Sequence, residues 1–256
     1  MLDEQGPALA AASSRRVLAI SPPGWETPPL AAAEYRPTAL SRRLIGLFDE
    51  LGAPHVTFVG FSWGATIGCH LAATEPDRVD ALVLLDAGYT DAQDRPGFVE
   101  PDLATVTAQM VEQARAFRWS SWEECFAFFR PHVPQWGASH ERRLRAGLRE
   151  EEGAIVPVVS PEVAAAAAYG VAAEPPSATL SRLGRLGLPI LLVAASETVA
   201  TEHGARALAR FRGAVPAAEV VEVESGHDLL LDAPEATVAA VSAFLRGSSP
   251  RDVSRA

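Results

Sequence analysis

The pentapeptide Gly60-Phe61-Ser62-Trp63-Gly64 carries the clearest chemical signal in the chain. A serine in Gly-x-Ser-x-Gly spacing acts as a nucleophile where a strand leads into it and a helix leads out, because the sharp turn between them exposes the hydroxyl. At such a turn, side chains at Gly60 and Gly64 would collide with the crowded strand and helix. We therefore predict that Ser62 is the nucleophile of a covalent reaction.

The dipeptide Gly226-His227 offers the base that this serine needs. A serine hydroxyl is a weak nucleophile at neutral pH, and an adjacent histidine activates it by accepting its proton. His227 follows the last strand expected in the chain, although a histidine in a solvated loop would have no such role. We favour the reading in which Ser62 and His227 meet at one rim of a parallel sheet.

The elements that must position these residues alternate between strand and helix. Short apolar, β-branched segments predict buried strands, and apolar residues at helical spacing predict helices. This alternation is typical of a parallel sheet covered by helices on both faces. The expected strands are 16–20, 55–60, 79–85, 188–194 and 219–224, and the expected helices are 39–51 (N-cap Thr38), 65–74, 202–211 (N-cap Thr201) and 234–245.

Between these blocks the alternation stops. Trp122, Phe126 and Phe129 recur at helical spacing and predict a helix with an aromatic stripe, and 163–169 predicts an alanine-rich helix. We therefore expect an α/β core formed by residues 1–87 and 188–256, with residues 88–187 inserted into it as a helical cap.

Four segments resemble the α/β-hydrolase superfamily, and the resemblance runs from about Gly6 to the C-terminus. They read RVLAISPPGW, HVTFVGFSWGATIGCHLAATEPDRVDALVLLDAG, LPILLVAASE and AEVVEVESGHDLLLDAPE. The resemblance implies a mostly parallel sheet flanked by helices, a Ser–His–acid triad and a helical cap. These motifs are shared across the superfamily and point to no single substrate.

The resemblance leaves two carboxylates open as the triad acid. Family members usually carry Asp or Glu after the strand that follows the cap, and here that slot falls on Thr198, with Glu197 beside it. Other members carry the acid after the strand that follows the nucleophile helix, which here is Asp86. A strand-end aspartate is also common in relatives that do not use it. We weigh Asp86 and Glu197 almost equally and lean towards Asp86.

The oxyanion formed by nucleophilic attack requires two aimed N–H donors. The resemblance assigns one to Trp63, whereas the usual second donor, on a His-Gly loop after an upstream strand, has no counterpart before Val17. The fold therefore looks N-terminally incomplete. Three explanations stay open: a start site further upstream, which we favour, a genuine fragment, or direct pairing of the two flanking strands with a remodelled site. Loss of one oxyanion donor costs roughly 100- to 1000-fold in rate.

Composition bounds the remaining functions. The 256 residues have 48% hydrophobic content, which suits one sizeable core, and their formal net charge of -10 disfavours nucleic-acid and anionic membrane partners. Cys69 and Cys125 lack the spacing of a disulfide framework or zinc site. No phosphate loop, metal cluster or cofactor motif is found, and no signal segment or membrane span. We expect a cytoplasmic protein without cofactor or metal.

The first hypothesis is therefore a serine hydrolase that cleaves a small-molecule ester, thioester or amide by acyl-enzyme chemistry. The cap aromatics would roof an apolar pocket or simply join the cap to the core. A second hypothesis is a non-catalytic or degenerate binding protein with the same fold. A third is a cofactor-free haloperoxidase-like or acyl-transfer enzyme, which the sequence does not separate from a hydrolase.

Overall fold

The computed structural model describes residues 2–25, 27–100, 102–133 and 136–247, which divide into two compact units. The sheet unit comprises Leu2–Ala19, Arg36–Glu100 and Gly170–Ala256. The helical unit comprises Ile20–Tyr35 and Pro101–Tyr169.

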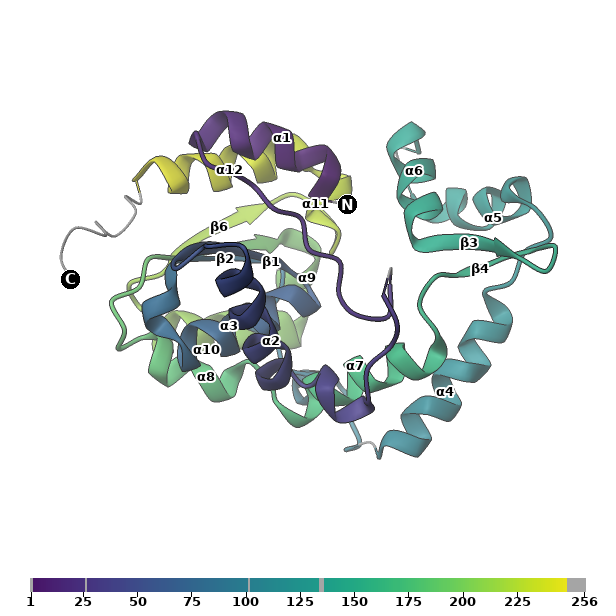
Figure 1. Cartoon of the computed structure of the whole chain (residues 1–256), viewed down its shortest axis with the longest axis horizontal. Helices are drawn as coiled ribbons and strands as arrows, with labels where there is room; N and C mark the ends of the chain where they lie inside the picture. Colours follow the sequence, from purple (N-terminus) through teal and green to yellow (C-terminus); the bar gives the residue numbers. More distant parts are fainter. Residues whose placement is uncertain (1, 26, 101, 134–135, 248–256) are drawn as a thin grey trace. The chain divides into compact units, whose positions relative to one another are not determined.

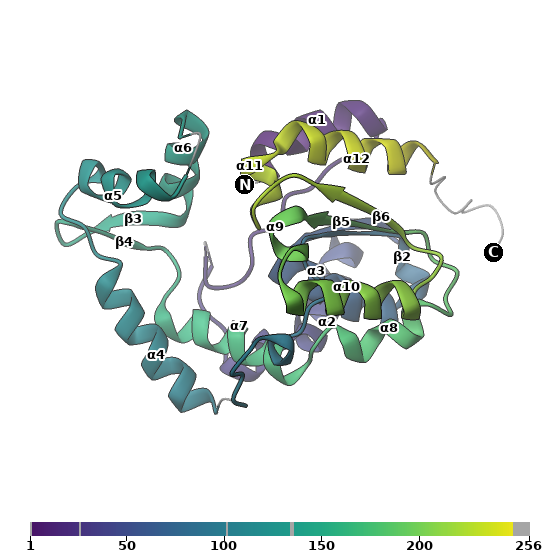
Figure 2. The same cartoon turned by 180° about the vertical axis from the view of Figure 1, so that it is seen from behind.

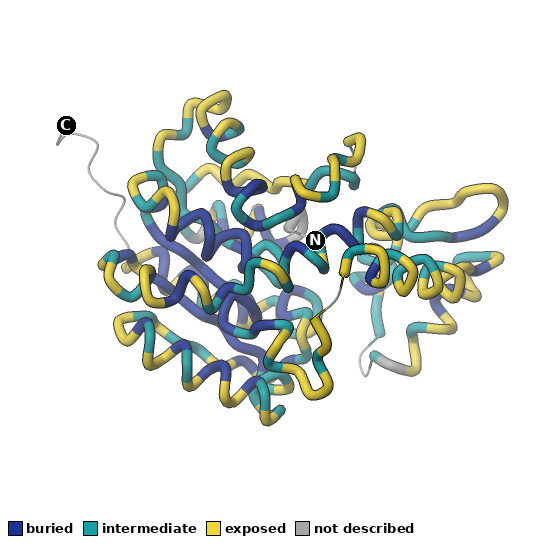
Figure 3. Tube along the Cα trace, turned by 90° about the horizontal axis from the view of Figure 1, so that it is seen from below, coloured by how far each residue is buried: buried dark blue, intermediate teal, exposed yellow. Residues whose placement is uncertain are grey.

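A four-stranded parallel sheet forms the centre of the sheet unit, in the order β1-β2-β5-β6 (Figure 1). The two central strands are almost wholly apolar and buried, as expected where helices cover both faces of a parallel sheet. Figure 3 shows the strands as a dark-blue layer among partly exposed helices. The strands are β1 (Val56–Phe61), β2 (Val79–Leu85), β5 (Ile190–Ala195) and β6 (Glu219–Val223).

Helices cover both faces of this sheet (Figures 1 and 2). On one face, α12 (Pro234–Gly247) contacts β5 and β6 and carries α1 (Leu2–Ser13) on its outer side. On the other, α3 (Trp63–Thr74) packs on β1 and β2. This second layer also contains α2 (Pro37–Glu50), α8 (Ser177–Leu183) and α10 (Glu202–Ala214), and short turns are η2 (Pro76–Arg78), η3 (Ala92–Asp94), α9 (Ser196–Val199) and α11 (Leu229–Asp232).

The predicted α/β class with a mostly parallel sheet is confirmed, but two local predictions are wrong. Residues 16–20 form no strand, and Val17 and Leu18 are 38% and 46% exposed. A strand needs a neighbouring edge that takes up its backbone hydrogen bonds. Arg15, just before this segment, contacts β1 through its side chain, which donates to the Thr57 hydroxyl. Thr38 is not the N-cap of α2: Arg36 holds that position.

The helical unit contains helices and one hairpin. Its aromatic cluster buries Trp119 and Phe126, and the Arg145 guanidinium lies 4.3 Å from the Trp122 ring centroid. The hairpin corrects the expectation of a purely helical insertion. Its elements are η1 (Ala32–Tyr35), α4 (Leu103–Ala116), α5 (Trp122–Phe129), η4 (Arg130–His132), α6 (Ala138–Gly147), the antiparallel pair β3 (Leu148–Glu151) and β4 (Ala154–Pro157), and the start of α7 (Pro161–Ala173). Within the part of the chain that the structure describes, no helix combines the length and apolarity needed to cross a bilayer.

Candidate active site

The turn that carries Ser62 joins β1 directly to α3. Ser62 has φ 52° and ψ −117°, a conformation that costs free energy for a residue with a side chain. Its N–H donates to the carbonyl of Leu85 on the neighbouring strand at 3.2 Å, so the hydrogen bonds of the sheet continue up to Ser62. The serine is therefore held rigidly on a strained strand-to-helix turn.

The glycines of this turn differ in what they permit. A Cβ at Gly60 would lie 2.4 Å from the carbonyl oxygen of Gly64, so only glycine fits there. A Cβ at Gly68 would lie 2.7 Å from the Phe58 ring, which is the close helix-to-sheet contact. At Gly64, by contrast, an added Cβ would have no atom within 4 Å apart from those of its chain neighbours and its own helix backbone. The steric reason that we expected at this position is therefore wrong.

Strand register brings the other candidates to the same rim as the serine. Phe61 pairs with Leu85, and Leu85 pairs with Val193, so the ends of β1, β2 and β5 lie side by side. Asp86 is the first residue after β2, and its N–H donates to the Val193 carbonyl at 2.8 Å. His227 lies between β6 and α11, on the loop that follows the last strand.

Ser62, His227 and Asp86 form a continuous hydrogen-bonded line. His227 Nε2 lies 3.0 Å from Ser62 Oγ, and His227 Nδ1 lies 2.8 Å from Asp86 Oδ2. The imidazole is therefore oriented so that one ring nitrogen faces the nucleophile and the other faces a carboxylate. Its side chain is 55% exposed, whereas that of Asp86 is completely buried.

Three donors bind the Asp86 carboxylate, two of them buried and the third, Thr198, partly buried. Oδ1 accepts from the Ala195 N–H at 2.9 Å and from the Tyr89 hydroxyl at 3.1 Å, and Oδ2 accepts from the Thr198 hydroxyl at 2.6 Å. Burial and, secondarily, the charge of Asp86 raise the pKa of Tyr89, so its hydroxyl keeps its proton and remains a donor. These bonds offset the desolvation of a buried charge.

Glu197, the other candidate acid, is not the residue that meets the imidazole. It lies in α9, and its N–H donates to the carbonyl of Ser225 at 3.2 Å. Its carboxylate approaches Gly226, where Oε2 would lie 3.4 Å from an added Cβ. His227 Nδ1 faces Asp86 instead, so of the two open candidates the structure brings Asp86 to the histidine.

The family model described as the alpha/beta hydrolase fold matches residues 3–234. The chain belongs to this family.

Individual relatives of this α/β-hydrolase match only short segments. A lipase, LipV, of Mycobacterium tuberculosis is 46% identical over 55 residues, which is 22% of this chain and 21% of the relative. Epoxide hydrolase 3 of Siraitia grosvenorii is 33% identical over 72 residues, which is 28% of this chain and 23% of the relative. The matched segment thus spans less than a quarter of each of these relatives.

Solved structures agree with the fold over nearly the whole chain. An E-2-(acetamidomethylene)succinate hydrolase has a TM-score of 0.73 at 22% identity, covering 94% of this chain and 85% of its own. The enol-lactonase from Burkholderia xenovorans LB400 has a TM-score of 0.64 at 20% identity, covering 96% and 86%. At these identities the likeness concerns the fold alone.

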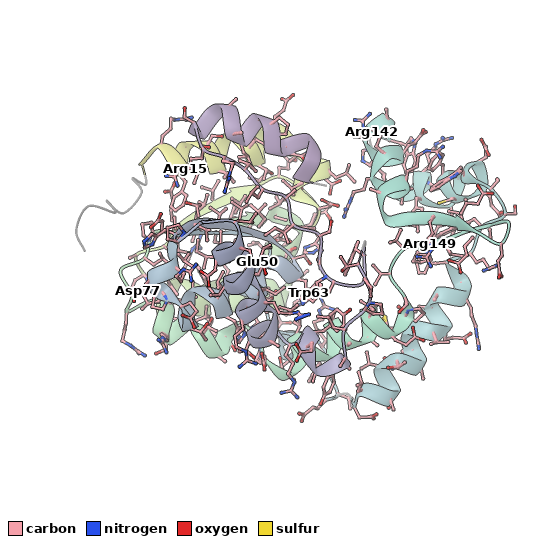
Figure 4. All side chains as sticks on the ribbon, viewed as in Figure 1. Arg15, Glu50, Trp63, Asp77, Arg142 and Arg149 are labelled. Carbon is pink, nitrogen blue, oxygen red and sulfur yellow. The ribbon has the colours of Figure 1, made fainter. Side chains whose placement is uncertain are left out.

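In this α/β-hydrolase, Trp63, which is labelled in Figure 4, is the first residue of α3 and follows Ser62 directly. The first N–H groups of a helix have no acceptor within the helix, and the positive end of the helix dipole favours negative charge there. An oxyanion formed beside Ser62 would meet this helix end. Among the residues that the structure describes, no group of three or more His, Cys, Asp or Glu side chains has the arrangement of a metal site.

Sequence reasoning missed Tyr89, and it placed the acid slot on Thr198 without assigning that side chain a role. Tyr89 and Thr198 both donate to Asp86, one from the segment after β2 and the other from α9. The only signal in the sequence was position, because Tyr89 follows a strand-end aspartate by three residues. Phe61 is a further neighbour, with its ring centroid 5.1 Å from that of His227.

Proposed function

We propose that this protein is a serine hydrolase that cleaves a small-molecule ester, thioester or amide through an acyl-enzyme. One observation carries the proposal: His227 lies between Ser62 Oγ, at 3.0 Å, and Asp86 Oδ2, at 2.8 Å. Ser62 Oγ attacks the acyl carbon while its proton passes to His227 Nε2. The Trp63 N–H holds the oxyanion, and Asp86 stabilises the imidazolium.

The second half of the cycle uses the same residues. Collapse of the tetrahedral intermediate breaks the bond to the leaving group, which departs with the proton from His227 Nε2. Water then attacks the acyl carbon of the ester formed on Ser62 and gives its proton to His227. The acid product leaves, and the serine hydroxyl regains the proton.

The serine also favours acyl substrates over epoxides, a class named among the relatives. Attack of Ser62 on an epoxide carbon would give an ether, which has no carbonyl carbon for water to attack. An acyl-serine is an ester and can turn over. The lipase named among the relatives supports the same choice.

A serine-reactive fluorophosphonate probe tests the proposal directly. We expect labelling of the wild-type protein at Ser62, none in Ser62→Ala, and a reduction of at least about 1000-fold in labelling rate in His227→Ala. Hydrolysis of p-nitrophenyl acetate should fall in parallel. His55→Ala is the matched control, because His55 precedes β1 at the strand end remote from Ser62, and it should label like the wild type.

The opposite outcome has a definite meaning. If the folded wild-type protein showed neither labelling nor ester hydrolysis, the proposal would be wrong. A non-catalytic binding protein with this fold would then be the better description. If labelling occurred but the acyl group passed to an added alcohol or thiol faster than to water, the enzyme would be an acyltransferase with the same three residues.

A further inference from the structure

The two oxygens of the Asp86 carboxylate bind different groups. A carboxylate has about four acceptor positions, and all are used. Oδ1 takes the Ala195 N–H and the Tyr89 hydroxyl, and both of these donors are completely buried. Oδ2 takes the Thr198 hydroxyl at 2.6 Å and faces His227 Nδ1 at 2.8 Å. Among the residues that the structure describes, Thr198 is therefore the one side chain that donates to the same Asp86 oxygen that His227 faces.

Thr198 is itself held in place by the start of α10. Its carbonyl accepts from the Thr201 hydroxyl at 2.7 Å, and that hydroxyl in turn accepts from the Gly204 N–H at 3.0 Å. A Cβ at Gly204 would lie within 2 Å of the Thr198 carbonyl oxygen, so this approach requires glycine. The capped helix end thus fixes the turn from which the Thr198 hydroxyl reaches the acid.

We infer that Thr198 is a positioning residue for the reaction: its hydroxyl fixes the Asp86 carboxylate so that Oδ2 faces His227, and it moderates the negative charge on that oxygen. The inference rests on the proposed function. An O–H donor withdraws negative charge from the oxygen to which it binds. Without it, Oδ2 stabilises the imidazolium more strongly.

The test compares Thr198→Val, which keeps the shape and removes the hydroxyl, with Thr198→Ser, which keeps the hydroxyl. For p-nitrophenyl acetate, we expect Thr198→Val to lower kcat/KM roughly tenfold. The acidic limb of its pH profile should move upward by roughly half a pH unit to one unit. Thr198→Ser should restore both quantities to near the wild-type values. Thermal unfolding of each variant shows whether it is folded under assay conditions.

Thr74→Val is the matched control. Thr74 is exposed, and its hydroxyl donates to the His70 carbonyl of its own helix, so the same atomic change occurs away from the acid. Its pH profile should coincide with that of the wild type. An active wild type whose Thr198→Val variant loses activity with an unmoved acidic limb, or loses less than twofold, overturns the inference and leaves the proposed function intact. Absence of labelling in the folded wild type overturns both.

Discussion

The carboxyl ends of β2 and β5 each carry a carboxylate, yet the protein holds them in contrasting ways. Asp86 follows β2 with φ 45°, is completely buried, and accepts bonds from three donors besides facing His227. Glu197 lies in the short α9 after β5. From this helix, the neutral side chain of Thr198 reaches the Asp86 carboxylate. The strand end that follows the nucleophile helix is therefore the one built around a buried charge.

This contrast distinguishes the two candidate acids by their surroundings. A strained backbone and a fully bonded buried carboxylate cost free energy unless the surrounding structure specifies them. Asp86 has both features, whereas Glu197 is exposed and is not among the described residues with positive φ. Position relative to the strands allowed both residues, whereas burial and hydrogen bonding distinguish them.

We expect the largest effect when the charge of each carboxylate is removed in turn. Asp86→Asn should lower kcat/KM for p-nitrophenyl acetate by about 1000- to 10000-fold, because an amide at Oδ2 no longer stabilises the imidazolium or fixes the correct tautomer. Asparagine tolerates the positive φ of this position. Glu197→Gln should change kcat/KM by less than about threefold, as for a group outside the line of proton transfer. Equal losses in the two variants would show that the acid was assigned wrongly.

A second comparison concerns how tightly the backbone is constrained beside each carboxylate. Gly88 has φ 81°, and an added Cβ would lie 3.0 Å from Cys69 Sγ and 3.1 Å from Leu84. Gly88→Ala should therefore lower the free energy of unfolding by about 2–4 kcal/mol, from left-handed strain and crowding of the core. Urea denaturation monitored by circular dichroism measures this change.

Gly226→Ala is the counterpart on the Glu197 side. The atoms that an added Cβ would approach, Asp232 Oδ2 at 2.8 Å and Glu197 Oε2 at 3.4 Å, are ends of side chains that can turn away. We expect a loss of less than about 1 kcal/mol. A loss as large as that of Gly88→Ala would mean that the Glu197 carboxylate is held as firmly as the Asp86 end.

The sequence predicted the elements whose pattern is local. Strand β2 begins and ends where it was expected, because an apolar run between Arg78 and Asp86 has clear limits. The Thr201 cap of α10 is also present, since capping depends on a few neighbouring residues. The strand, turn and helix around Ser62 were also predicted from neighbouring residues, and this pattern located the candidate nucleophile.

What the sequence did not predict depends on partners far away in the chain. Residues 16–20 have the composition of a strand but form none, because strand formation also requires a neighbouring edge. The hairpin turn at Glu152 and Gly153 is a local exception: both residues have positive φ, but Glu-Gly is not one of the Asn-Gly or Asp-Gly pairs that mark such turns most strongly. The roles of Tyr89 and Thr198 could not be read at all, since each bond to Asp86 exists only after the strands are aligned.

A further comparison concerns the side chain that supports the β2 end from α10. On α10, Arg210 donates to both Asp94 oxygens at 2.7 Å and to the Tyr89 carbonyl at 3.0 Å, and it lies 3.2 Å from Asp91. Arg210→Ala should lower the free energy of unfolding by about 1–2 kcal/mol at neutral pH, because two partly buried carboxylates lose their cation. Arg212→Ala, on the same helix, should cost less than about 0.5 kcal/mol, since its pair with Glu222 is about half exposed.

The pH dependence of this loss separates charge from packing. The Arg210 hydrogen bonds hold the pKa of Asp94 below its ordinary value of 3.8. A carboxyl whose pKa is lower in the folded state stabilises the fold above the unfolded pKa, and this stabilisation disappears as the pH falls through the folded value. The difference between wild type and Arg210→Ala should therefore be full at pH 7 and shrink below about pH 4. A difference that stayed constant down to pH 2.5 would mean that Arg210 acts through the packing of its side chain, and that its charge contributes nothing to the support of the β2 end.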